Sequence, residues 1–334
     1  MPVVSIKQKQ MTESIISLGG FVLLRLKVYI RAITRIHLPS SRGAVFRGAL
    51  GSAFSSIVCR NTSASCSDCG DKKVCLFDRY FERKEEAGRP APLRPYVLEP
   101  PPGFEETIQD GEEFSLGVTL IGESINHLGL FLSALDKMCR TGIGEGRHRC
   151  LGQCRLERVL VHKQEGLVPL LSESASVNLP NSGLVQRWYK IRSNGEDIQQ
   201  IRLHFLSPTT IKRNNKIIED FFPFNILVLR LLERISILDR LYCGDTLNIN
   251  REDFEQAALA KVSVVREMSE GGWVEVRTRS RSDQGMPVNI GGLVGHIVYK
   301  GEIGPFLNIL RLGEHIHVGK KPQYGNGRFA CEAI

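Results

Sequence analysis

Hydrophobic and polar residues alternate along the first long segment of the chain, residues 21–30. Apolar side chains at every second position alternate with basic or aromatic ones: Leu24, Leu26, Val28 and Ile30 against Arg25, Lys27 and Tyr29. A period of two places the two sets on opposite faces of a β-strand. We therefore expect a strand with one buried apolar face and one basic face.

Similar patterns give the order of the remaining elements. Apolar residues recur at helical spacing in four segments, 45–58, 128–139, 226–242 and 306–312. Short strand-like runs occupy 113–121, 150–161, 201–205, 261–265, 273–281, 292–299 and 328–332, and the proline-rich segment 89–103 is predicted to be an extended connector. Each half is predicted to follow the order β-α-β-β-α-β. The predicted fold class is α+β, with tandem ferredoxin-like (RRM-like) domains.

The chain has 334 residues, 42% of them hydrophobic, which is enough for two domains with cores of their own. We expect an N-terminal domain over residues 1–165 with a cysteine-rich insertion at 59–88. Residues 166–194 are polar and weakly patterned, which predicts a linker. The C-terminal domain is expected over 195–334, with a glycine-rich loop at 318–328.

A short motif occurs in both halves. Residues 144–150 and 325–331 both fit the pattern G-x-G-R-x-x-C. Each copy follows a predicted helix and precedes a predicted strand. Glycine is common in this chain, so chance is the alternative, but the agreeing flanks favour duplication of one domain. In the second loop, glycines beside Lys320 and Lys321 predict an anion site, most plausibly for phosphate.

The charge distribution favours a polyanionic partner. The net charge is +8 and the pI is about 9.1. Residues 14–67 contain no Asp or Glu but seven basic residues: Arg25, Lys27, Arg31, Arg35, Arg42, Arg47 and Arg60. Since a solvated surface normally mixes both signs, this run predicts a nucleic-acid surface.

A second basic pattern lies in the other half. Arg277, Arg279 and Arg281 occupy every second position, with Trp273 on the same parity. On one strand the four would share a face. A charged sheet edge is the alternative, and a track for the RNA backbone is the preferred interpretation.

The sequence predicts a cytoplasmic protein, and its cysteines predict a metal site. No leader or membrane-spanning segment is apparent, so we expect no membrane partner, and nine cysteines in the cytosol are typically thiols or metal ligands. Cys59, Cys66, Cys69 and Cys75 form C-x6-C-x2-C-x5-C. This spacing predicts a structural zinc site. Unrelated thiols and an iron–sulfur cluster are the alternatives.

Three of the eight histidines are candidates for chemistry. His37 lies in the acid-free basic run, and His315 and His317 directly precede the second glycine loop. A lone histidine is most often structural, and we assign that role to the others: His127, His148, His162, His204 and His296.

The C-terminal residues carry a family resemblance. The runs GGLVGHIVYKGE (291–302), PFL (305–307), LGEHIHVGK (312–320) and YGNGRF (324–329) follow one another in this order. Weaker matches lie upstream at residues 47–51, 59–75, 142–147 and 223–227. The chain resembles the repeat-processing endoribonucleases of CRISPR systems, which belong to the RAMP superfamily.

The resemblance implies tandem ferredoxin-like domains that bind CRISPR repeat RNA and cleave it without a metal cofactor. The ribose 2′-hydroxyl would attack the adjacent phosphate, giving a 2′,3′-cyclic phosphate and a 5′-hydroxyl. That chemistry needs a base, an acid and cations. We expect His37, or failing that His317, as base or acid, with Lys320 supporting the phosphate. The residues expected to bind RNA are Arg31, Arg35, Arg42, Arg47, Arg147, Arg277, Arg279, Arg281, Lys320, Lys321 and Arg328.

The chain departs from its relatives at one position. They often have a histidine directly after the Arg-Gly-Ala-Leu-Gly motif, where this chain has Ser52. Two alternatives to the nuclease therefore stay open. One is a non-cleaving subunit that holds CRISPR RNA in an effector complex. The other, less favoured, is a metalloenzyme built on the cysteine cluster.

Overall fold

The computed structural model describes eleven stretches of the chain: 16–60, 66, 68–82, 93–103, 106–146, 151–170, 185–191, 198–244, 251–265, 271–279 and 287–334. Contacts divide the chain into two compact units, and the division between Gln186 and Arg187 falls inside the predicted linker 166–194. We call residues 23–186 the N-terminal unit and residues 187–334 the C-terminal unit. Of the described residues, 16–22 group with the C-terminal unit, although the sequence predicted a first domain beginning at residue 1.

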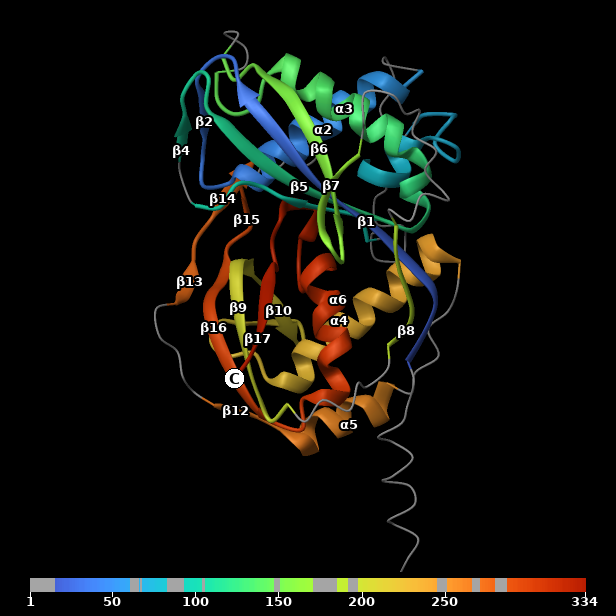
Figure 1. The fold of residues 1–334 in the computed structure, drawn as a ribbon, viewed down its shortest axis with the longest axis vertical. Helices are drawn as coiled ribbons and strands as arrows, with labels where there is room; N and C mark the ends of the chain where they lie inside the picture. The colour runs from blue at the N-terminus through green and yellow to red at the C-terminus, as the bar shows by residue number, and fades with distance from the viewer. Residues whose placement is uncertain are drawn as a thin grey trace, which may run out of the picture. The chain divides into compact units, whose positions relative to one another are not determined.

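The N-terminal unit has the predicted β-α-β-β-α-β order. Its elements are β1 (Ile16–Ala32), α2 (Arg42–Val58), β3 (Tyr96–Glu99), β5 (Glu113–Ile121), α3 (Leu128–Thr141) and β6 (Cys154–Lys163). The sheet runs in the order β3-β5-β1-β6, and β7 (Gly166–Pro169) extends its edge. Neighbouring strands are antiparallel. Figure 1 shows α2 and α3 together on one face of this sheet.

Strand β3 lies where the sequence predicted only an extended connector. Tyr96, Val97 and Leu98 are fully buried, and β3 pairs with β5 along its whole length. The prolines that flank it cannot donate to a ladder, which hid the strand in the sequence. It supplies the second strand that the ferredoxin-like order requires.

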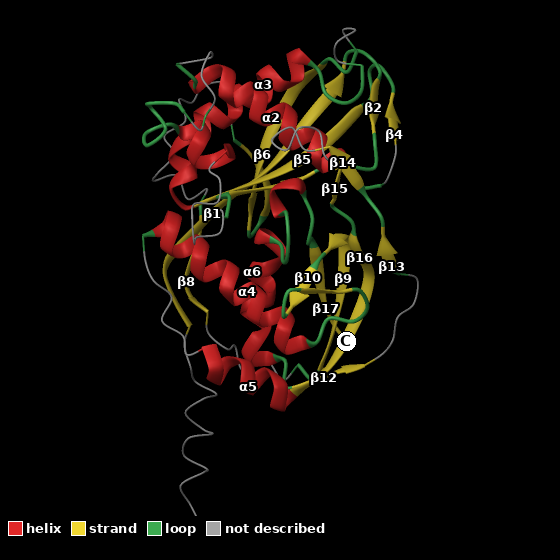
Figure 2. Ribbon diagram, turned by 180° about the vertical axis from the view of Figure 1, so that it is seen from behind, coloured by secondary structure: helices red, strands yellow, loops and turns green. Residues whose placement is uncertain are grey.

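The C-terminal unit repeats the arrangement. Its six elements are β9 (Gln200–Thr209), α4 (Phe224–Leu238), β12 (Val262–Val265), β16 (Gly292–Gly301), α6 (Leu307–Ile316) and β17 (Phe329–Ala333). The sheet order is β12-β16-β9-β17, which corresponds strand by strand to that of the first unit. Figure 2 shows α4 and α6 beside this sheet. The fold is therefore a tandem of ferredoxin-like units, as the sequence predicted.

Shorter elements complete the described structure. In the N-terminal unit they are β2 (Ile36–Leu38), β4 (Glu106–Ile108) and the helical turns Asp78–Glu82 and Gly122–His127. The C-terminal unit adds α5 (Arg251–Lys261), β10 (Ile211–Arg213), β11 (Lys216–Ile218), β13 (Gly272–Val274), β14 (Arg277–Arg279), β15 (Pro287–Asn289) and the turns Asp239–Cys243, Gly304–Phe306 and Pro322–Tyr324. Strand β8 (Gln186–Ile191) pairs with β1. Within the described ranges, no helix is both long enough and apolar enough to span a membrane.

The cores follow the predicted periodicities. On β1, Leu24, Leu26, Val28 and Ile30 are at most 1% exposed, whereas the residues between them are half-buried. On α4, which lies in the predicted helical segment 226–242, the apolar stripe Val228, Leu231, Ile235 and Leu238 is fully buried. Both patterns are confirmed, because burial on one face is what produces them.

Backbone hydrogen bonds close the loop after α3 and join it to residues 35–37, which follow β1. Ile143 donates to the carbonyl of Gly152 over 2.9 Å, and Gly152 donates to that of Arg35 over 3.2 Å. Glu145 donates to the carbonyl of His37 over 3.2 Å. A Cβ on Gly144 would lie 2.3 Å from the His37 carbonyl oxygen, so this close approach requires glycine.

The loop after α6 repeats these bonds at the end of β9. Val318 donates to Gly327 over 2.9 Å, Gly327 to Pro208 over 3.1 Å, and Lys320 to Thr210 over 3.2 Å. Here Gly319 makes the close approach, since its Cβ would lie 2.4 Å from the Thr210 carbonyl oxygen.

These matching bonds support the predicted duplication but correct its register. The G-x-G-R-x-x-C pattern aligned Gly146 with Gly327. The hydrogen bonds instead align Gly152 with Gly327, Gly144 with Gly319, and Glu145 with Lys320. Glycine is required wherever the backbone is crowded, so similar glycine spacing arose at non-equivalent positions.

Candidate active site and nucleic-acid interface

His37 lies in an acid–base cluster of the N-terminal unit. Strand β2 carries it, and the pairing of β2 with β4 sets His37 opposite Thr107. The Nδ1 atom of His37 is 3.3 Å from Thr107 Oγ1, and its Nε2 atom is 3.9 Å from Glu145 Oε2. The side chain is 35% exposed. A ring held by a hydroxyl and a carboxylate, yet open to solvent, can accept and donate protons.

Glu145 was not a predicted site residue. It lies in the first glycine loop, far along the sequence from the acid-free run that contains His37. A β-bridge between the two residues brings them together. The only signal in the sequence was Glu145's place between two glycines of the repeated motif.

Two arginines predicted to bind RNA are structural instead. Arg42 is 5% exposed, and its guanidinium donates to the carbonyls of Pro101 and Pro102 and to Glu106. Arg47 donates to the carbonyl of Phe81 over 2.7 Å and lies 3.6 Å from Glu82. The charges of both arginines hold α2 against neighbouring segments. These contacts argue against the predicted role of Arg42 and Arg47 in RNA binding.

The other basic residues of this run differ in their surroundings. Arg31 is bound by Glu113 and Glu157, so acids from neighbouring strands neutralise a face that looked uniformly basic in sequence. Arg35 is exposed, and its role in RNA binding stays a prediction. Arg147 lies outside the described residues.

The C-terminal unit gathers three lysines at its glycine loop. The amide of Lys320 bonds to Thr210, which brings the loop next to β10 and Lys212. Arg230 donates twice to the carbonyl of Lys212, at 2.9 and 3.2 Å, and so fixes that strand. Lys321 Nζ lies 3.4 Å from the Asn289 carbonyl oxygen.

Burial and mutual repulsion both act on the lysines of this loop. Burial lowers the pKa of Lys320, and the neighbouring Lys212 lowers it further. Burial, and then the charge of Lys320, likewise lower the pKa of Lys321. A bound phosphate would raise the pKa values of both lysines again, because a nearby opposite charge favours the protonated form. The sequence analysis did not predict Lys212 as a site residue. Lys212 follows a predicted strand, and nothing in the sequence near it indicates that the glycine loop of Lys320 lies beside it.

His317 does not reach the surface. It is 0% exposed, ends α6 with a φ of 63°, and its Nδ1 atom lies 3.1 Å from the carbonyl oxygen of Asn326. This placement argues against contact with RNA and for a role in bracing the glycine loop. His315 is half-buried in the last turn of the same helix.

The predicted arginine track is divided between two strands. Trp273 lies in β13, which pairs with β16, whereas Arg277 and Arg279 lie in β14, which pairs with β15. The two strands are separated at the buried Val276, so Trp273 does not share a strand face with the arginines. Arg277 is exposed and 3.9 Å from Glu275. Arg281 and the side chain of Arg279 lie outside the described residues. Arg328 is half-buried directly before β17.

The four clustered cysteines are half-buried thiols. Burial raises the pKa of Cys66, and the charges of Glu82, Cys75 and Cys59 raise it further, so these groups lie near one another. In the described part of the chain, no three His, Cys, Asp or Glu side chains are arranged to hold a metal ion. Zinc at Cys59, Cys66, Cys69 and Cys75 stays a prediction.

Two family models match the chain. Residues 203–329 match the model described as CRISPR-associated endoribonuclease Cas6, over the glycine loop and its lysines. This part of the C-terminal unit is therefore similar in sequence to Cas6 endoribonucleases. Residues 21–182 match AF_1859_N, described as an N-terminal domain. The predicted resemblance to repeat-processing CRISPR proteins is confirmed.

Solved Cas6 structures have the same fold. A Cas6 product complex superposes with a TM-score of 0.54 at 16% identity, covering 93% of this chain and 99% of that one. The corresponding part of a partial Cas6-RT-Cas1–Cas2 complex gives 0.57 at 11% identity, covering 95% of this chain and 47% of the other. An uncharacterized protein of Archaeoglobus fulgidus is 30% identical over 122 residues, which are 36% of this chain and 42% of that protein. The match thus spans less than half of that relative.

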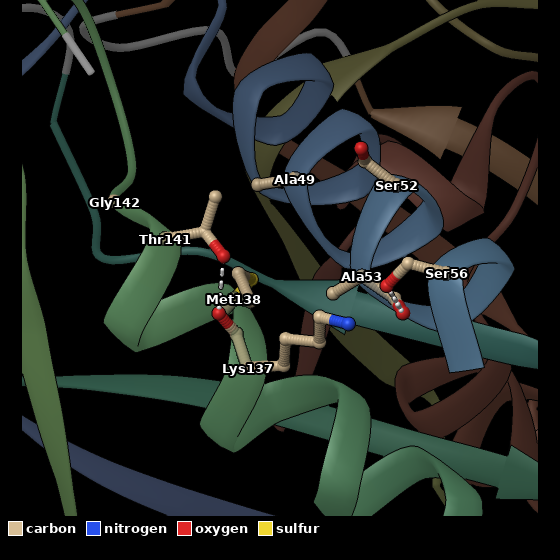
Figure 3. Close-up of a pocket in the computed structure, with 8 residues that line it drawn as sticks. All are labelled: Ala49, Ser52, Ala53, Ser56, Lys137, Met138, Thr141 and Gly142. Atoms are coloured by element: carbon tan, nitrogen blue, oxygen red, sulfur yellow. Dashed lines mark hydrogen bonds between the residues drawn. The ribbon is translucent and has the colours of Figure 1, made fainter. Parts of the chain in front are cut away.

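Ser52 is the position at which the sequence analysis found a departure from the endoribonucleases that the chain resembles. It is exposed on α2 and lines a small cavity of about 160 Å³ between α2 and α3 (Figure 3). The other lining residues are Ala49, Ala53, Ser56, Lys137, Met138, Thr141 and Gly142. The hydroxyls of Ser56 and Thr141 donate to carbonyls of their own helices. A serine hydroxyl is not a useful base at neutral pH, so Ser52 cannot take the role that a histidine could have at this position.

Proposed function

We propose that this protein binds CRISPR repeat RNA and cleaves precursor CRISPR RNA within the repeat. The 2′-hydroxyl of one ribose attacks the adjacent phosphate, the bond to the 5′-oxygen breaks, and the products carry a 2′,3′-cyclic phosphate and a 5′-hydroxyl. The match of residues 203–329 to the Cas6 endoribonuclease model is the observation that carries the proposal. The lysine cluster of that domain supplies the charge that RNA binding requires.

His37 is the proposed acid–base group. Neutral imidazole can take the proton of the attacking 2′-hydroxyl, and the Glu145 carboxylate, 3.9 Å from Nε2, stabilises the imidazolium that forms. Thr107 limits rotation of the ring through Nδ1. The same imidazolium, or a bound water, can return a proton to the departing 5′-oxygen.

Lys320 is the proposed cation for the RNA phosphate. Lys321 and Lys212 surround it, and Arg328 follows in the same loop. Cations fixed in this loop attract the negatively charged RNA backbone. His37 provides the proposed base and acid, the lysines hold the RNA, and the proposed reaction uses no metal cofactor.

The test is single-turnover cleavage of the cognate repeat RNA in EDTA, with analysis of the product ends. Cutting that leaves a cyclic phosphate and a 5′-hydroxyl supports the proposal. Activity lost on chelation and restored by metal would contradict metal independence. Binding without cutting would support the non-cleaving subunit, for which Ser52 is the motivating observation. Co-purification with other CRISPR proteins tests membership of an effector complex.

A further inference from the structure

Two histidines that the sequence analysis assigned to structural roles lie side by side on the open face of the C-terminal sheet. His204 on β9 is directly opposite His296 on β16, and their ring centroids are 5.7 Å apart. The neighbours of His204 on the same strand, Leu203 and Phe205, point into the core. His204 itself is 39% exposed.

Their strands are the two central ones of the sheet. The order β12-β16-β9-β17 places β9 and β16 in the middle, and they are the first and third strands of the ferredoxin-like order. Sheets of this RRM-like kind present aromatic side chains on their open face, where RNA bases stack. Histidine is among the side chains that serve this purpose.

Hydrogen bonds hold the His204 ring by its edge. Glu332 on β17 lies 2.8 Å from His204 Nε2 and also accepts from Arg202 over 2.9 Å. The bond from His204, then that from Arg202, lower the pKa of Glu332, so this carboxylate is ionised at neutral pH. An edge bond fixes the ring plane and leaves the ring faces available for stacking. On the β17 side, the residue opposite His204 is the small Ala330.

The surroundings fit unpaired RNA. Lys300 on β16 is exposed near this face, Arg202 lies one pleat from His204, and Leu206 is 56% exposed on the same side of β9. Cations, aromatic rings and an exposed apolar side chain match a phosphate backbone and stacked bases. A metal ion fits poorly, because Glu332 already bonds the Nε2 atom that would coordinate it.

We propose that His204 and His296 form a stacking site for unpaired nucleotides of the RNA on the sheet of the C-terminal unit. The inference rests on the proposed function, because it takes RNA as the ligand. Aromatic rings pack with centroids about 4.5–7 Å apart, so the two histidines leave no space for a base between them. The bases lie on the outward surfaces of the rings, with the backbone passing Arg202 and Lys300.

The experiment measures binding of a single-stranded RNA oligonucleotide that carries the fluorescent base 2-aminopurine, at several salt concentrations. The double variant His204→Ala/His296→Ala should lose about tenfold or more in affinity, along with quenching of the fluorescent base. Its salt dependence should match that of the parent, because stacking releases no counterions. The matched double variant with phenylalanine at both positions keeps the rings and should bind within a few-fold of the parent.

Three outcomes would overturn the site. One is parent-like affinity and quenching in the alanine variant. Another is an equal loss in the phenylalanine variant, which would point to imidazole hydrogen bonding. The third is lost cleavage with intact binding, which would give the pair a role in chemistry. A parent that binds neither the oligonucleotide nor the repeat RNA would instead contradict the proposed function itself.

Discussion

The carboxylate of Glu145 lies 3.9 Å from the imidazole Nε2 of His37, across a β-bridge that joins the first glycine loop to strand β2. In the C-terminal unit, the equivalent loop position is Lys320, whose amide bonds to Thr210 as that of Glu145 bonds to His37. The same junction thus carries an acid–base pair in one unit and a cationic cluster in the other.

The first prediction concerns His37. Replacing it with alanine should slow single-turnover cleavage of repeat RNA by about a hundredfold or more while RNA binding holds, because a positioned base contributes that much. Glu145→Gln should give a smaller loss, since it removes the charge but keeps the shape. His317→Ala is the comparison: from its buried position we expect loss of stability, measured by thermal unfolding. Parent-like cleavage by His37→Ala would exclude it as the base.

The second prediction concerns the lysine cluster. Lys212→Ala and Lys320→Ala should each weaken binding across RNA sequences and reduce the slope of log affinity against log salt by about one. Because burial and Lys212 lower the pKa of Lys320, its contribution should fade as pH rises toward a value below the ordinary lysine range. Lys216→Ala, on exposed β11 of the same hairpin, is the control. Unchanged slopes in both variants would place the cluster away from the RNA.

The third prediction concerns the two close backbone approaches. Gly144→Ala and Gly319→Ala introduce a Cβ at 2.3 and 2.4 Å from a carbonyl oxygen, at φ values of +84° and +79°. The left-handed conformation alone costs roughly 1–2 kcal/mol, and the overlap adds to that. Gly111→Ala, with φ +80° and no atom within 4 Å of the added Cβ, isolates the conformational part. In urea unfolding, Gly111→Ala should lower the free energy of unfolding least of the three variants. Equal losses in all three would contradict the close backbone approaches at Gly144 and Gly319.

The fourth prediction concerns the arginines. Arg42→Met leaves Glu106 and two carbonyls without their donor, so it should lower the free energy of unfolding by about 1–3 kcal/mol. Joint replacement of Arg277, Arg279 and Arg281 by alanine should instead weaken RNA binding and leave stability within about 0.5 kcal/mol. Chemical denaturation and RNA titration separate the two effects. A stable Arg42→Met protein with weakened binding would restore its predicted RNA role.

The fifth prediction concerns zinc. Protein purified without chelator should contain about one zinc per chain, and its removal should expose Cys59, Cys66, Cys69 and Cys75 to alkylation and destabilise the N-terminal unit. Elemental analysis and mass spectrometry after alkylation measure both. Four freely alkylated thiols in metal-free native protein would exclude the site.

What the sequence by itself determined is local. The period of two along β1 and the stripe on α4 predicted the buried faces, because each pattern reports how one element meets its core. The order of elements in each half followed, and with it the tandem ferredoxin-like class. Among the six elements of the N-terminal ferredoxin-like order, β3 was not predicted, because its buried residues Tyr96, Val97 and Leu98 lie among prolines.

Only the tertiary structure decided which charges meet. The acid-free run predicted a basic surface, yet Glu106 bonds Arg42, and Glu113 and Glu157 bond Arg31. These partners are far away in sequence and arrive through strand pairing, which no local pattern records. The same holds for the pairing of Glu145 with His37, the meeting of His204 with His296, and the true register of the duplication. Electrostatic and stacking contacts depend on distances of a few ångströms, and those distances are set by how strands pair and loops close.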